Sequence, residues 1–247
     1  MRPRRLLFWA AALLLIVGPR LDAQRIADER SRREAVQFYR NGQDFMSAEK
    51  FERAAEEFAK AIEKDSLFTL AHYSLGQAFM NLQRYGSAIK AFEGCIEASR
   101  QLYSLAETNR FAVEKQRQDE IHEMRETVQV LQKSGHQLLA VRAEQHLEDL
   151  QTQRTSIGGG FRAPAEVLLS LGSAYFRNGD REPAEAQWKA AVDVNPKLAE
   201  AHNNLAVIYM QTGRLDEADQ EIKTAEKNGF RVNPQFKQDL KDRRKKP

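Results

Sequence analysis

Apolar residues recur along most of the chain at spacings of three and four, which is the period of helices that bury one face. Leu75 and Phe79 are separated in this way, and after a short polar break Ala88 and Phe92 show the same spacing. This pattern predicts two short helices joined by a turn. Similar pairs of apolar stretches occur in both halves of the chain, and together they predict an all-α fold.

The same residue types return after 34 positions. Gly42 and Gly76 are 34 residues apart, and so are Tyr175 and Tyr209 in the second half of the chain. Small residues allow two helices to approach closely, and aromatic side chains fill the space beside them. A fixed period with small and aromatic residues in phase therefore predicts a tandem repeat of helix pairs.

Four units of this kind fall at 35–68, 69–102, 165–198 and 199–232, and they resemble the tetratricopeptide repeat (TPR) family. The first unit departs from the family pattern at Asn41, where leucine is expected. The resemblance implies a solenoid of helix-turn-helix repeats, arranged as two pairs. The third unit matches best, through Leu171, Gly172, Tyr175, Ala184, Trp188, Ala191 and Pro196.

The segment between the second and third repeats is charged and rich in glutamine. Apolar residues recur in it at helical spacing on both sides of a Ser-Gly turn at 134–135. This predicts a hairpin of two helices at about 104–133 and 136–155, followed by a Gly-rich linker at 156–160. Two arrangements fit the pattern: the hairpin leaves and rejoins the repeat stack, or its helices pack as degenerate repeats that lengthen the stack.

The first 23 residues have the layout of a secretory signal peptide. Three arginines precede an uninterrupted apolar run from Leu6 to Val17, and the segment ends at the small residue Ala23. Twelve apolar residues would span only about 18 Å as a helix, against a hydrocarbon core of about 30 Å. We therefore expect cleavage after Ala23 and export to the periplasm or the cell exterior. An uncleaved leader that tethers the protein to a membrane is the alternative.

The formal net charge of +3 belongs to this leader, because residues 24–247 contain 34 basic and 34 acidic side chains. A mature chain without net charge gives no reason to expect a nucleic-acid partner. Residues 237–247 carry a net charge of +4. We interpret this tail as a solubilising end, with weak contact to an anionic membrane as the alternative.

The residues that could carry chemistry are better explained by packing. His72 and His202 occupy the same position of their repeats, and Cys95 takes the place of a small residue that faces a neighbouring helix. His122 and Glu126 fall where a metalloprotease helix would carry two histidines, so the second ligand is missing. We therefore expect no catalytic residue, metal or cofactor.

The resemblance implies that the first helix of each repeat lines a concave groove, through positions two, five, nine, twelve and thirteen of the unit. Chaperone-binding members of the family clamp a carboxylate with lysine, arginine and asparagine at positions five and nine. This chain has no lysine or arginine at these positions, so a carboxylate clamp of that kind is not expected; the residues are Tyr39, Gln43, Tyr73, Gln77, Leu169, Ser173, Asn203 and Val207. Apolar and amide groups predominate instead, so we expect an exported, non-enzymatic scaffold that binds a peptide or partner helix of an unidentified protein. The groove is expected to include Tyr39, Gln43, Met46, Tyr73, Gln77, Met80, Leu169, Phe176, Asn203 and Met210.

The alternative function is a structural one, in which copies of the protein assemble into homo-oligomers in the cell envelope. In that case the hairpin at 104–155 would pair between copies. The residues expected at such a contact are Ile121, Val128, Leu147 and Leu150.

The domain organisation follows from these assignments. Ser31 and Glu34 fit a capping box at the start of the first repeat helix, and a charged helix with an apolar edge follows the last repeat. The expected order is a signal peptide (1–23), a cap with two repeats (24–102), the hairpin and linker (103–164), two more repeats (165–232) and a solvating helix with the basic tail (233–247).

Overall fold

The computed structural model describes residues 26–135, 137–152 and 160–245, and every regular element in this part of the chain is an α-helix. The predicted all-α fold is therefore confirmed. The predicted signal peptide and most of the Gly-rich linker lie outside the described residues. The helices are α1 (Glu29–Ser47), α2 (Phe51–Lys64), α3 (Thr69–Asn81), α4 (Tyr85–Leu105), α5 (Arg110–Lys133), α6 (Gln137–Thr152), α7 (Ala165–Asn178), α8 (Arg181–Val194), α9 (Ala199–Gln211), α10 (Leu215–Lys227) and α11 (Pro234–Lys245).

The four repeats are the helix pairs α1/α2, α3/α4, α7/α8 and α9/α10, in which the two helices pack against each other. In the first three pairs, a glycine of the first helix faces an aromatic ring of the second; in the fourth pair the corresponding residues are Ala206 and Ile222. A methyl group added at Gly42 would lie 2.5 Å from Cε1 of Phe58, and one added at Gly172 would lie 2.5 Å from Cδ1 of Trp188. The glycines thus permit the close approach that the repeat pattern predicts.

The first repeat helix begins earlier than the capping box predicts. Asp28 precedes the helix, and its carboxylate accepts hydrogen bonds from the backbone N–H groups of Arg30 and Ser31, both at 2.9 Å. The Ser31 hydroxyl donates to the same carboxylate at 3.2 Å. Asp28 is therefore the N-cap and Ser31 lies inside the helix, because a carboxylate at this position satisfies the free N–H groups of the first turn.

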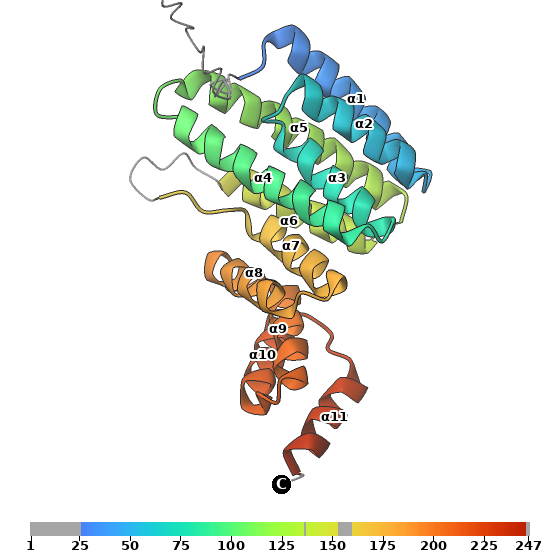
Figure 1. Ribbon diagram of the computed structural model, residues 1–247, viewed down its shortest axis with the longest axis vertical. Coiled ribbons are helices and arrows are strands. Elements are labelled where there is room, and N and C mark those ends of the chain that lie inside the picture. Colours follow the sequence, from blue (N-terminus) through green and yellow to red (C-terminus); the bar gives the residue numbers. More distant parts are fainter. Residues whose placement is uncertain (1–25, 136, 153–159, 246–247) are drawn as a thin grey trace, which may run out of the picture.

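The inserted hairpin consists of α5 and α6, and it leaves the repeat stack continuous. Helix α4 packs directly against α7, as α2 packs against α3. The hairpin thus neither lengthens the stack nor stands away from it, and in Figure 1 it lies behind α3 and α4. Its first helix begins at Arg110 instead of residue 104, because α4 continues to Leu105 and the Asn109 side chain then caps the new helix.

The apolar face of the hairpin belongs to the core of a single chain. Ile121, Met124 and Leu150 are buried in one cluster with Tyr39 and Leu70 of the repeats. Four hairpin residues were expected to contact a second copy of the protein, and this expectation needs correction. Ile121, Val128 and Leu150 are buried within the chain, and Leu147 packs against the same cluster.

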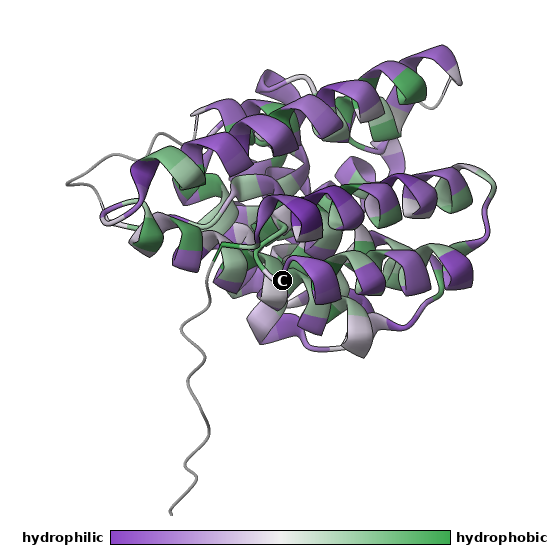
Figure 2. Cartoon of the chain, turned by 90° about the horizontal axis from the view of Figure 1, so that it is seen from above, coloured by the Kyte–Doolittle hydropathy of each residue, from purple (hydrophilic) through white to green (hydrophobic). Residues whose placement is uncertain are grey.

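Helix α11 closes the far end of the stack. Its Leu240 is buried in the core of the last two repeats, and Phe236 packs beside it. Basic residues of the tail pair with the last repeat: Arg244 contacts Asp216 at 2.7 Å, and Lys237 contacts Glu226 at 2.5 Å. Seen from above in Figure 2, hydrophilic residues cover most of the outer helix faces. Among the described residues, no helix is both long enough and apolar enough to cross a membrane.

Candidate protein-binding groove

All ten predicted groove residues lie on α1, α3, α7 and α9, which are the first helices of their repeats. None of them is fully exposed, so part of the expected groove is covered. Tyr39, Tyr73, Leu169 and Met210 are buried. Gln43, Met46, Gln77, Met80, Phe176 and Asn203 are partly buried.

Helix α6 covers groove positions two and five in the middle of the stack. The ring of His146 lies against Tyr73, with 4.4 Å between ring centroids. Arg142 Nη2 pairs with the carboxylate of Glu200 at 2.5 Å. Tyr73 and Glu200 occupy positions five and two of their repeats, where the TPR resemblance places ligand contacts. The hairpin therefore occupies a surface that was expected to face a partner.

The groove remains open mainly at positions nine, twelve and thirteen, although Leu169 of position five and Glu200 of position two also line the opening. There the structure has a pocket of about 420 Å³ between α3, α7 and α9, with Arg142 of α6 at its edge. Of the ten predicted residues, this pocket brings together four. These are Gln77, Met80, Leu169 and Phe176. Sequence reasoning also placed Ser173, Arg177 and Val207 on this surface, and they line the same pocket.

The other predicted groove residues serve different contacts. The Gln43 amide donates to the Tyr39 hydroxyl at 2.6 Å, and Met46 packs against the core of the first repeats. Met210 is buried in the core of the last repeats, and its carbonyl accepts a hydrogen bond from Arg243 of α11 at 3.2 Å. The two ends of the groove are thus closed by packing within the chain.

Where α6 meets the repeats, the structure buries titratable groups that sequence reasoning did not single out as a cluster. Burial raises the pKa of Glu166 to about 8, and the neighbouring Glu200 carboxylate acts in the same direction. Burial also lowers the pKa of His146 to about 4. Asp149 of α6 accepts a hydrogen bond from the backbone N–H of Glu166 at 3.1 Å. Glu166 stands at position two of its repeat, and this position was the only sequence signal for its role.

Helix α5 attaches the hairpin to the first two repeats. Nε and Nη2 of Arg40 donate to the Glu123 carboxylate at 2.9 and 2.8 Å. The Gln116 amide donates to the Leu67 carbonyl at 2.8 Å, deep in the structure. These buried or partly buried polar contacts position α5 more firmly than apolar packing alone would.

Among the described residues, one group of side chains has the spacing to hold a metal ion. The ligand atoms of His122, Glu123 and Glu126 lie within 4.8 Å of one another. Arg40 already pairs with both carboxylates, at 2.8 Å from Glu123 and 3.2 Å from Glu126. The guanidinium supplies the positive charge that a metal would otherwise bring.

Cys95 and the two histidines of equivalent repeat position have structural surroundings. Cys95 is buried, and this burial raises the pKa of its thiol. A ring nitrogen of His72 donates to the Ser66 carbonyl at 3.0 Å, and one of His202 donates to the Pro196 carbonyl at 2.9 Å. Each histidine therefore holds the turn that precedes its own repeat.

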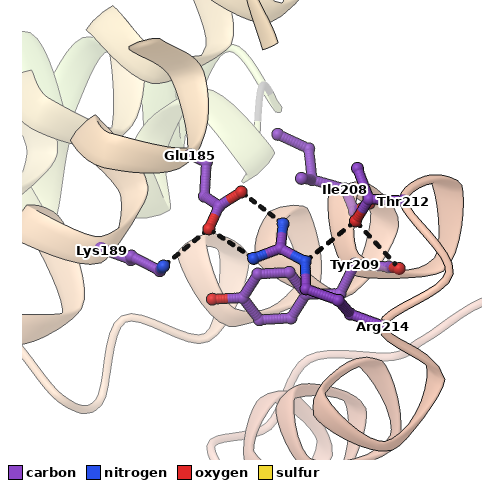
Figure 3. A network of polar contacts seen from close by, with 6 residues as sticks. All are labelled: Glu185, Lys189, Ile208, Tyr209, Thr212 and Arg214. Atoms are coloured by element: carbon purple, nitrogen blue, oxygen red, sulfur yellow. Dashed lines mark hydrogen bonds and ion pairs between the residues drawn. The ribbon is translucent and has the colours of Figure 1, made fainter. Parts of the chain in front are cut away.

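A network of polar contacts connects the third and fourth repeats (Figure 3). Arg214 donates two hydrogen bonds to the Glu185 carboxylate, and its guanidinium lies 4.2 Å from the centre of the Tyr209 ring. Lys189 contacts the same carboxylate at 2.6 Å. Hydrogen bonds from these cations lower the pKa of Glu185 to about 2. Because these contacts join α8 to α9 and to the turn before α10, we assign this network a structural role.

Comparison with known proteins gives the same repeats. A family model described as tetratricopeptide repeat matches residues 39–102 and 169–228. Photosystem I assembly protein Ycf3 of Rippkaea orientalis is 40% identical over 47 residues, which are 19% of this chain and 27% of that protein. The chain thus spans about a quarter of this relative.

Solved structures of low identity are also similar. The crystal structure of PilW, a type IV pilus biogenesis factor, is 13% identical, with a TM-score of 0.42 over 88% of this chain and 87% of that one. YrrB, described as a TPR protein with an unusual peptide-binding site, is 20% identical, with a TM-score of 0.32 over 87% and 95%. Because the two matched segments of the family model cover half of the 247 residues, the chain belongs to the tetratricopeptide repeat family.

Proposed function

We propose that the protein is an exported, non-enzymatic scaffold that binds a segment of another protein in the open part of its groove. Tetratricopeptide repeats form protein-interaction scaffolds, and this chain has four helix pairs of that kind. The observation that carries the proposal is the pocket of about 420 Å³ at positions nine, twelve and thirteen. Its walls combine apolar side chains and amides with the charged groups of Arg142, Arg177 and Glu200. The apolar part suits an apolar side chain of a peptide, and the amides suit its backbone.

The polar groups of the pocket support a peptide ligand. Gln77 and Asn204 place amides beside Met80 and Phe176. Amides donate to and accept from a peptide backbone whatever its sequence, whereas methionine and phenylalanine adapt to apolar side chains. Export rests on the leader at 1–23, which has the charge and apolar pattern of a signal peptide.

The test is a variant with Met80→Ala and Phe176→Ala together. Both side chains are partly buried at the pocket; Met80 packs against the cluster that contains Phe92, and Phe176 lies against the Trp188 ring. We expect this variant to lose most of its crosslinking to the partner in its native compartment, while its helicity stays unchanged by circular dichroism. The matched control is Lys90→Ala on the exposed side of α4. Unchanged crosslinking by the double variant would contradict the proposal.

Self-assembly is the second candidate function, and it is supported by a different set of residues from the one first predicted. The hairpin exposes four large apolar side chains, which are Phe111, Val130, Leu139 and Val141. Phe111 is the most exposed of them, and a second copy that packed on it would remove its ring from water. Light scattering at micromolar concentration tests this candidate. A monomer that Phe111→Ser leaves unaltered would rule out assembly through that residue.

A further inference from the structure

Helix α6 meets the repeats with one face, in the manner of a bound helical ligand. The residues of this face are Arg142, His146, Asp149 and Leu150, which follow one another at spacings of four, three and one. In that order they contact Glu200 of α9, Tyr73 of α3, the N-terminus of α7 and the apolar core of the first repeats. Spacings of three and four place these side chains on the same side of a helix.

The repeat stack does not need α6 for its continuity. Helix α4 packs directly on α7, so the second and third repeats join without the hairpin between them. Helix α6 packs mainly on α5 and contacts α7 less extensively. Removal of α6 from the groove would thus expose the surface of α3, α7 and α9 while the stacked helices keep their partners.

The contact between α6 and the groove leaves polar atoms without hydrogen bonds. Among the described residues, Arg142 Nε, His146 Nδ1 and both carboxylate oxygens of Glu166 are buried without a partner. Buried polar groups of stable interfaces are nearly always paired, because an unpaired one loses its bonds to water. These atoms would regain bonds to water or to a ligand when α6 moves away. The contact is therefore weaker than its buried area suggests.

We propose that α6 is an exchangeable occupant of the groove, and that the partner that replaces it is an amphipathic helix with the same contact pattern. Such a helix has an arginine for Glu200, an aromatic or imidazole ring four residues later for Tyr73, and an acidic residue and a leucine seven and eight residues after the arginine. This inference rests on the proposed groove function and adds the chemistry of the partner.

The tethered helix competes with any partner at a high effective concentration, of millimolar order for short linkers. A partner must therefore offer contacts that α6 does not make. The pocket lined by Met80 and Phe176 adjoins α6 at Arg142 and provides such contacts. A partner helix continued by an apolar segment would occupy both surfaces.

The experiment uses a labelled synthetic peptide with the sequence of 137–152 and the full-length chain, with fluorescence anisotropy as the readout. Arg142→Ala in the chain frees Glu200, and the arginine of the peptide then pairs with it. We expect the peptide to bind this variant about tenfold more tightly than the unsubstituted chain. His146→Ala in the chain is expected to act in the same direction through Tyr73.

Two controls make the result specific. Gln151→Ala changes an exposed residue of α6, so the chain with this substitution is expected to bind the peptide as the unsubstituted chain does. A peptide that carries Arg142→Ala itself is expected to lose the gain on the Arg142→Ala chain. If the peptide binds no variant, or binds all of them equally while circular dichroism shows intact helices, α6 is not exchangeable. If the variant with Met80→Ala and Phe176→Ala still loses its crosslinking to the partner in that case, the proposed function holds and only the exchange of α6 is contradicted.

Discussion

At the scale of single residues, glycines set the distance between the helices of a pair. Gly42, Gly76 and Gly172 each face an aromatic ring that occupies the space of a missing methyl group. The 34-residue period made these positions predictable, because a small residue returned in phase with an aromatic one. Close approach of the two backbones is the physical reason why a small residue recurs in phase with an aromatic one.

Gly76→Ala tests this role. The added methyl group would overlap the Phe92 ring, so we expect the free energy of unfolding to fall by about 1–3 kcal/mol. The matched control is Gly86→Ala in α4, where nothing lies within 4 Å of the added atom. Alanine favours helices over glycine, so the control is expected to raise stability by up to about 1 kcal/mol. Urea unfolding of both variants gives the comparison, and an equal effect would contradict the packing argument.

Polar residues were harder to predict than the glycines. Asp28 caps the first helix although Ser31 and Glu34 carry the usual capping pattern, because both side chains suit the start of a helix and only the backbone geometry selects one. The buried state of Glu166 was not predicted either. Periodicity identifies which face of a helix is covered, but not which charged side chains the cover will enclose.

Arg214→Ala tests the network between the third and fourth repeats. The variant loses two hydrogen bonds to Glu185 and the contact with the Tyr209 ring, so at pH 7 we expect a loss of about 1 kcal/mol or more. The folded-state pKa of Glu185, about 2, lies below its value in the unfolded chain. The stabilisation is thus present above pH of about 4.5 and declines as the pH falls toward 2.

Unfolding of the variant and the unsubstituted chain at pH 7 and pH 3 measures this decline. We expect the difference between them to be smaller at pH 3. Arg231→Ala, at an exposed arginine, is expected to show no such trend. A difference that stays constant from pH 7 to pH 3 would show that the carboxylate of Glu185 is not the group involved.

At the scale of helices, the hairpin shows which features the sequence predicts. Its two helices were predicted from apolar residues at three- and four-residue spacing, and α5 and α6 have ends close to those expected at the turn. The position of the hairpin was left open, because an apolar stripe containing Ile121 and Leu150 fits a repeat core, a second copy or the groove equally well. Long-range contacts such as Arg142 with Glu200 selected the groove, and these contacts have no local signal.

Glu166→Gln tests the contact of α6 with α7. Burial raises the pKa of Glu166 to about 8, well above its value in the unfolded chain, so the folded chain holds a proton that the unfolded chain releases. Stability therefore falls as the pH rises from about 4.5 to about 8. Glutamine removes this titration. We therefore expect the stability of the variant, measured relative to the unsubstituted chain, to be higher at pH 8 than at pH 5 by more than about 1 kcal/mol.

Urea unfolding of the Glu166→Gln variant and of the unsubstituted chain, at pH 5 and at pH 8, provides the measurement. The titrations of His146 and Glu120 are present in both proteins and cancel in the difference. Glu148→Gln, at an exposed carboxylate of α6, is the matched control and is expected to change little with pH. If the difference for Glu166→Gln is the same at pH 5 and pH 8, the buried carboxylate does not oppose the closed position of α6.

At the scale of the whole molecule, four repeats form one stack whose concave side is divided. The hairpin covers positions two and five of the groove, and the pocket with Met80 and Phe176 remains open at positions nine, twelve and thirteen. The TPR resemblance predicted the surface as a whole. Which part of this surface is covered depends on where the hairpin packs, and the repeat pattern contains no information about that position.

The most direct test of the account is site-specific crosslinking in the native compartment. The photoreactive residue p-benzoylphenylalanine replaces Met80 at the open pocket or, in a matched protein, Lys90 on the exposed side of α4. The account predicts a discrete crosslinked partner from position 80, its loss when Phe176→Ala is added, and no such product from position 90. Equal products from both positions, or a product from position 90 alone, would contradict binding in the groove.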